Sequence, residues 1–102
     1  MERKNFDYDE LTDSLFISRK DSNEKVQGSA EIGNLVIDFT STGRIVNVEF
    51  LNISKFLEMM KIDTKILEQL TDVKLIIQKQ RGAVSIFAIL KTLKLEQPIP
   101  LA

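Results

Sequence analysis

The sequence contains no cysteine and no histidine. Without cysteine the chain can form no disulfide, no thiolate nucleophile and no sulfur metal site. Without histidine it has no Ser-His-Asp or Cys-His arrangement, no imidazole ligand and no ordinary side chain that titrates near neutral pH. Any general acid or base would have to be a carboxylate, a lysine or Tyr8. We therefore predict that the protein is not an enzyme and uses no cofactor.

Long apolar runs are also absent. The longest, AVSIFAIL at residues 83–90, is far shorter than the roughly 20 apolar residues that a membrane-spanning helix needs. The N-terminal stretch MERKNFDYDE lacks the apolar segment of a signal peptide. These two observations predict a cytoplasmic protein without a membrane partner.

The chain has 102 residues, of which 43% are hydrophobic and 28% charged, which is typical of one globular domain over residues 1–102. Its net charge of −1 gives no long-range attraction to nucleic acid. The charge is unevenly divided, however. Residues 1–51 carry six Lys or Arg and ten Asp or Glu, whereas residues 52–102 carry eight and five. The two halves could therefore attract each other, within one chain or between chains.

Alternating apolar and polar residues predict three antiparallel hairpins. The first is NFDYDELTDSLFISRK, with a loop of about five residues. The second is LVIDFTSTGRIVNVEF, in which Gly43 fits a loop position with positive φ. The third is VKLIIQKQRGAVSIFAIL. The pattern does not decide whether residues 26–32 form a strand. Residues 83–95 could be helical instead of extended, because a continuous apolar run has no period. Their β-branched and aromatic content favours a strand.

Between the second and third hairpins the apolar residues take helical spacing. Asn52 and Asp63 stand where N-caps would begin two short helices, or one bent helix, within residues 52–70. The prolines of EQPIPLA predict an extended C-terminal tail over residues 96–102. The fold class predicted is α+β, with about six to seven strands in antiparallel hairpins and one short helical segment packed on one face. The predicted centre of the core is Leu35, Ile37, Phe39, Val46, Val48, Phe50, Phe56 and Leu57.

Two segments carry a resemblance to a known family. YDELTDSLFI at residues 8–17 and VIDFTSTGRIVNVEFLNISK at residues 36–55 resemble a small prokaryotic domain-of-unknown-function family, DUF family 2283. Asn47 departs where members often have Gly, and Thr40 where an acidic residue is usual. The resemblance implies a small cytoplasmic protein with no assigned activity or known cofactor, and an antitoxin-like role with a small protein partner. The matching residues are Asp9, Asp13, Leu15, Ile17, Gly43, Arg44, Ile45, Val46, Glu49, Leu51, Asn52, Ser54 and Lys55.

Two groups of charged residues provide alternative functions. The carboxylates of the Asp7–Asp13 turn could serve a metal-dependent enzyme, because hard cations prefer several oxygen ligands. Their spacing lacks the Gly and terminal Glu of a calcium loop, and turn hydrogen bonding explains them better, so we predict no metal site. A basic group on the last hairpin could bind nucleic acid weakly, although acidic residues flank it. This group is Lys74, Lys79, Arg81, Lys91 and Lys94.

The last hairpin breaks the alternation expected of a sheet with one wet face. If Val84, Ile86, Ala88 and Leu90 face the core, then Ile76, Phe87 and Ile89 face the other way. Covering such side chains is favourable, and a second copy of the same surface can cover them. The helical segment could cover this face instead. We thus predict a non-catalytic, self-associating interaction protein, a homodimer whose interface contains Ile76, Phe87 and Ile89.

Overall fold

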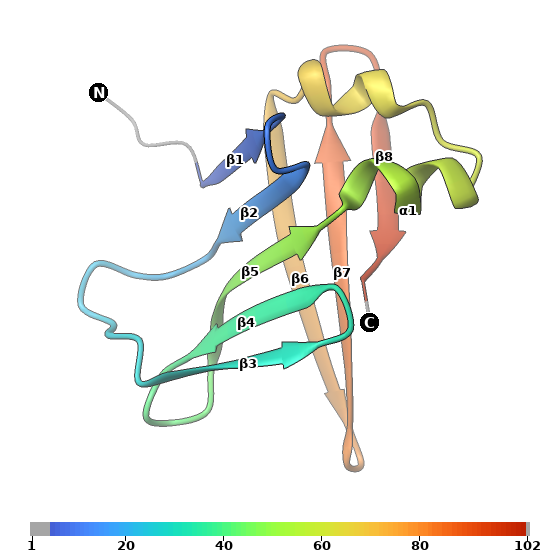
Figure 1. Cartoon of the computed structure of the whole chain (residues 1–102). Coiled ribbons are helices and arrows are strands. Elements are labelled where there is room, and N and C mark those ends of the chain that lie inside the picture. Colours follow the sequence, from blue (N-terminus) through green and yellow to red (C-terminus); the bar gives the residue numbers. More distant parts are fainter. Residues whose placement is uncertain (1–4, 102) are drawn as a thin grey trace.

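The computed structural model describes residues 5–101 and arranges them in two antiparallel sheets with two short helical turns at one end (Figure 1). Residues 1–4 and 102 lie outside the described part. The eight strands and single α-helix of the described residues confirm the α+β class. The elements are β1 Phe6–Asp9, β2 Ser14–Ser18, β3 Gly28–Ile32, β4 Leu35–Phe39, β5 Ile45–Leu51, α1 Ile53–Met59, the 3-10 helix η1 Thr64–Glu68, β6 Asp72–Gln80, β7 Ala83–Lys91 and β8 Glu96–Pro100.

The N-terminal half forms a five-stranded sheet in the order β1-β2-β5-β4-β3. The first two predicted hairpins are both present, and β2 joins them by pairing with β5. Residues 28–32, which the sequence left open, form the edge strand β3. Gly43 has φ 83° in the β4–β5 loop, as the loop position requires.

One detail of the second hairpin differs from the prediction. Asp38 pairs with Asn47 but Phe39 pairs with Ile45, so that Val46 is the extra residue of a β-bulge. The bulge brings Ile45 into the main hydrophobic cluster. Val46 is fully buried as predicted, yet it is not part of that cluster. An extra residue in one strand leaves no mark on the apolar pattern, so the sequence could not locate it.

The C-terminal half forms a three-stranded sheet in the order β6-β7-β8. Residues 83–91 are a strand, which confirms the strand interpretation of the last apolar run. Arg81 and Gly82 both have positive φ (34° and 81°) and join β6 to β7 in a tight two-residue turn. Residues 96–100 of the predicted extended tail are extended and pair with β7 as an additional strand.

The helical segment is two short helices, one of the two predicted arrangements. Asp63 caps η1 as expected, because its side chain accepts a hydrogen bond from the backbone N–H of Lys65. The prediction for Asn52 is wrong. Asn52 stands at the N-cap position with φ 57°, but its side chain makes no capping hydrogen bond. That function belongs to Asp13, which lies 41 residues before Ser54 and accepts hydrogen bonds from the side chain and backbone N–H of Ser54.

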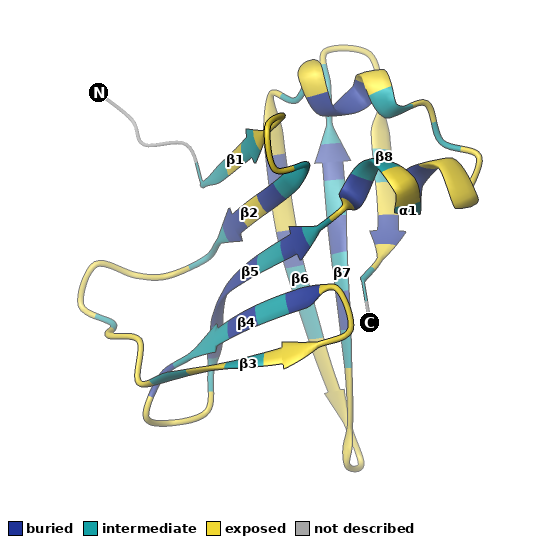
Figure 2. Ribbon diagram, in the orientation of Figure 1, coloured by how far each residue is buried: buried dark blue, intermediate teal, exposed yellow. Residues whose placement is uncertain are grey.

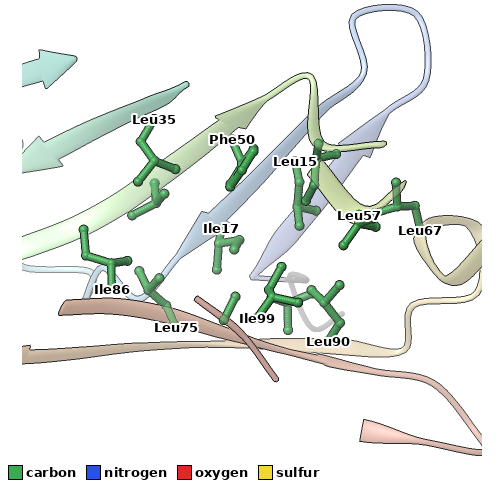
Figure 3. Close-up of a cluster of buried hydrophobic side chains, with 14 of the residues drawn as sticks. Leu15, Ile17, Leu35, Phe50, Leu57, Leu67, Leu75, Ile86, Leu90 and Ile99 are labelled. Carbon is green, nitrogen blue, oxygen red and sulfur yellow. The ribbon is translucent and has the colours of Figure 1, made fainter. Parts of the chain in front are cut away.

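The hydrophobic core lies between the two sheets, and the helices close one end of it (Figures 2 and 3). Leu15 and Phe50 reach into it from the five-stranded sheet, and Leu90 and Ile99 from the three-stranded sheet. Ile53, Leu57, Ile66 and Leu67 add the buried sides of the two helices. Of the eight residues predicted for the core centre, Phe39 and Phe56 are only partly buried, while the other six are buried.

Candidate interaction surface

The outer face of the three-stranded sheet carries the predicted interface residues. In β7, Ile86, Ala88 and Leu90 are buried in the core, so the alternate residues Phe87 and Ile89 point to the opposite face. The register places Ile76 directly opposite Phe87. All three side chains have intermediate exposure. The structure therefore brings the three residues together on one face.

Two prolines extend this apolar surface. Phe87 is paired with Pro100 of β8, and Ile89 with Pro98, so each row of the sheet ends in a proline. Both prolines are exposed. Sequence reasoning missed them because it assigned residues 96–102 to a tail, although Gln97 and Ile99 alternate with the prolines as strand residues do. We call Ile76, Phe87, Ile89, Pro98 and Pro100 the apolar face.

Nothing in the described part of the chain covers the apolar face. The two helices contribute their buried residues to the core on the other side of the sheet, which excludes the helical cover that the sequence left open. The tail residues 96–100 lie in the sheet itself. No described element therefore covers the outer side of the apolar face.

The charges beside the apolar face are balanced. Asp72, Lys91 and Glu96 form the next row across the three strands, and Lys91 Nζ lies 3.5 Å from Glu96 Oε1. Lys74 is exposed beside Ile89. Two acidic and two basic side chains thus surround one end of the surface, which gives it no strong charge of either sign.

The two edges of the three-stranded sheet differ. The N–H of Leu101 donates to the C=O of Ile86 in β7. Because the backbone groups of an antiparallel strand point alternately toward and away from the neighbouring strand, those of residues 97 and 99 also point toward β7. Positions 98 and 100 then face the open edge, where proline offers no N–H to another strand. At the opposite edge, the side-chain amide of Asn5 donates to the C=O of Val73 at 2.6 Å.

The carboxylates of the Asp7–Asp13 turn do not converge. Asp13 accepts hydrogen bonds from the Tyr8 hydroxyl (2.8 Å), from Ser54 Oγ (2.6 Å) and from the Ser54 N–H (3.2 Å). It therefore caps the start of α1 from another loop. Asp9 accepts from the N–H of Leu11 within its own turn, and Asp7 points outward. In residues 5–101, no group of three or more Asp or Glu side chains is arranged to hold a metal ion.

The Asp13 contact changes the titration of its neighbour. Burial, with smaller contributions from the hydrogen bond to Asp13 and from its charge, raises the pKa of Tyr8 from 10.0 to about 12. Tyr8 is the only tyrosine of the chain. At neutral pH the phenol therefore remains a hydrogen-bond donor that holds Asp13 in its capping position.

The basic residues of the last hairpin are dispersed. Arg81 lies in the β6–β7 turn, whereas Lys94 lies in the β7–β8 loop at the opposite end of β7 (Figure 1). Lys74 is on the apolar-face side, but Lys79 alternates with it and lies on the other side of β6. Lys91 is paired with Glu96. The structure therefore does not bring the five cations into one phosphate-binding groove.

Residues 5–54 match the model of a family described as protein of unknown function, DUF2283. This segment belongs to that family. The match confirms the resemblance found at residues 8–17 and 36–55. No curated protein and no solved structure matches the chain. Within the described residues, no helix has the length and apolar character needed to cross a membrane.

The DUF2283 segment corresponds to a structural unit. It contains all five strands of the first sheet and ends at Ser54, the residue that Asp13 caps. Its two departures from the family pattern both have local partners here. Thr40 Oγ1 accepts from the N–H of Arg44, and Asn47 Nδ2 donates to Asp38 Oδ2 at 3.0 Å. The apolar face lies outside the matched segment.

Proposed function

We propose that this protein is a non-catalytic interaction protein that self-associates through the apolar face. The observation that carries the proposal is the pair of apolar rows, Ile76–Phe87–Pro100 and Ile89–Pro98, on the side of the sheet that the core does not use. Leaving such side chains in water forgoes roughly 1.5–3 kcal/mol for each large one that could be buried. Contiguous apolar surface of this kind is typical of binding sites.

A second copy is the occupant that fits the surface best. A twofold interface brings one patch against itself, so the patch must not repel its own image. The balanced charges of Asp72, Lys74, Lys91 and Glu96 satisfy that condition. The prolines at the open edge of β8 disfavour sheet extension there, which leaves face-to-face packing as the arrangement we propose.

The non-catalytic part of the proposal rests on the chemistry of the side chains. The chain has no cysteine or histidine, and Asp13, the carboxylate of the turn with the most contacts, is used to hold Tyr8 and Ser54. The turn is thereby explained as a structural element. The alternative of a carboxylate-based enzyme has no corresponding geometry to support it.

The oligomeric state tests the proposal. Light scattering at micromolar concentration should give twice the monomer mass for the wild type. Replacing Phe87 and Ile89 together by Lys places two like charges from each copy in the interface, so this variant should be a folded monomer. Val84→Lys is the matched control, because Val84 is on the same strand but is 47% exposed on the opposite face.

Two results would contradict the proposal. A monomeric wild type at high micromolar concentration rules out the self-association. A double variant that stays dimeric, with unchanged circular dichroism, moves the interface away from the apolar face.

A further inference from the structure

The strand positions on the outer face of the five-stranded sheet carry charge of one sign only. Phe6, Tyr8, Leu35, Ile37, Val48 and Phe50 face or pack on the core, so the alternate residues of these strands point outward. Among the outward strand positions there is no Lys or Arg. The carboxylates on this face are Asp7, Asp9, Glu31, Asp38 and Glu49. We call this surface the acidic face.

An aromatic side chain lies between two carboxylates in one row of the acidic face. Phe16 is 37% exposed and pairs with Asp7 on one side and Glu49 on the other. A hollow of about 530 Å³ on one side of Phe16 is lined partly by Ser14 and Leu51. A second hollow of about 510 Å³ also borders Phe16 and is lined by Asn5, Ser18, Lys20, Asp21, Ser22 and Asn47. The ring thus separates two depressions that can receive side chains.

Several of the acidic groups have no local counter-charge. Asp38 is held by Ser29 Oγ (2.6 Å) and Asn47 Nδ2 (3.0 Å). By contrast, the carboxylates of Asp7, Glu31 and Glu49 have no hydrogen bond or ion pair with any described residue. Their charges are therefore available to a partner, and they lie in the same cross-strand row as Phe16.

We propose that the acidic face binds a basic segment of a different protein. Like charges would repel a second acidic face, so this surface is unsuited to the twofold contact proposed for the apolar face. A partner that covers Asp7 and Glu49 must bring cations, because a buried carboxylate without a counter-charge is costly. Lysine or arginine would pair with these two groups, and an apolar side chain would pack beside Phe16.

This inference concerns a second surface and does not depend on self-association. The apolar face and the acidic face are outer faces of different sheets, with the core between them (Figure 2). A dimer formed through the apolar face therefore leaves the acidic face of each copy open. One molecule could bind a second copy and a basic partner at the same time.

Selection from a library of random displayed peptides on the intact wild-type protein tests the inference. At low ionic strength, the enriched peptides should combine Lys or Arg with a large apolar residue. The best of them, synthesised and titrated, should bind more weakly as salt is added, because the charges are exposed to screening. Its affinity should fall about tenfold or more in Asp7→Asn/Glu49→Gln and in Phe16→Ser.

Two control variants make the outcome decisive. Glu58→Gln/Glu68→Gln removes two exposed charges elsewhere and should leave peptide binding unchanged. Phe87→Lys/Ile89→Lys should also bind the peptide normally, even if light scattering shows that self-association is lost or never occurred. The inference is overturned if no peptide is enriched, if the enriched peptides are not basic, or if the Asp7/Glu49 and Glu58/Glu68 variants bind equally.

Discussion

The inner faces of the two sheets are both apolar, but their outer faces differ in chemical character. Each contributes alternate apolar residues to one shared core. The five-stranded sheet, which is the DUF2283 segment, then presents only acidic charges outward, whereas the three-stranded sheet presents Ile76, Phe87 and Ile89. Like charges would make two acidic faces repel one another, whereas the apolar face suits the contact between copies that we propose. We therefore expect the two faces to bind different partners.

The inner face of each sheet is covered in part by the other sheet. Leu15, Ile17, Val48 and Phe50 are at most 3% exposed, and part of their cover comes from the three-stranded sheet and the helices. A single sheet without a second layer leaves such a face in water, and folding is then not favoured. We therefore expect the DUF2283 segment of this chain to need the residues that follow it in order to fold.

The largest predicted effect is the loss of folding when the two sheets are separated. A fragment of residues 1–61, which keeps α1 and the Asp13 cap, should be unfolded or aggregated, because its apolar inner face has no cover. Circular dichroism and denaturant titration, compared with the full chain, provide the measurement. A cooperative unfolding transition from a monomeric fragment would show that the five-stranded sheet is independent.

Local order was predictable from the sequence, but the pairing of distant segments was not. Apolar alternation and Gly43 identify the β4–β5 hairpin because both are properties of adjacent residues. The pairing of β2 with β5 and the capping of Ser54 by Asp13 join residues far apart in the chain. Asn52 is a residue type that often caps helices, yet its backbone is left-handed and its side chain makes no capping hydrogen bond.

The candidate surfaces were predictable only where they depend on a local pattern within one hairpin. Ile76, Phe87 and Ile89 reveal a second apolar face because strand alternation alone decides it. Pro98 and Pro100 were missed because proline is depleted in strands, and only their position at an edge makes them compatible with one. The acidic face requires the strand order, since Asp7 and Glu49 share a row only through β2.

A smaller effect is expected from breaking the link between the first hairpin and the helix. Asp13 accepts through both carboxylate oxygens, Oδ1 from Tyr8 and Oδ2 from Ser54, and Asp13→Asn replaces one of them by an NH₂ group that cannot accept. The loss of one of these hydrogen bonds should lower the free energy of unfolding by about 1–2 kcal/mol. Asparagine tolerates the φ of 53° at this position, so backbone strain should add little. Chemical denaturation of the full chain measures the change.

Asp9→Asn is the matched control for this link. Asp9 is exposed and accepts one hydrogen bond within its own turn, which an asparagine side chain also accepts. Its stability should therefore equal that of the wild type. Equal destabilisation by the two substitutions would mean that the general charge of the turn matters and that the helix cap does not.

The last effect is a pH dependence that arises from Tyr8 and is confined to alkaline solution. The pKa of the Tyr8 phenol is about 12 in the folded state, whereas in the unfolded state it is expected at the ordinary 10.0. The stabilising contribution is therefore fully present below pH 10 and is lost as the pH rises toward 12. Because the chain has a single tyrosine, ultraviolet absorbance of the phenolate reports this titration directly.

The same titration separates the causes of the shift. Asp13→Asn removes the carboxylate charge next to the phenol but leaves the burial, which is the largest single cause. The midpoint should therefore move from about 12 only part of the way toward 10.0. A wild-type midpoint already at the ordinary value would contradict the contact between Tyr8 and Asp13. An unchanged midpoint in the variant would show that Asp13 does not contribute to the raised pKa, which would then arise from burial and the more distant carboxylates Glu10 and Glu68.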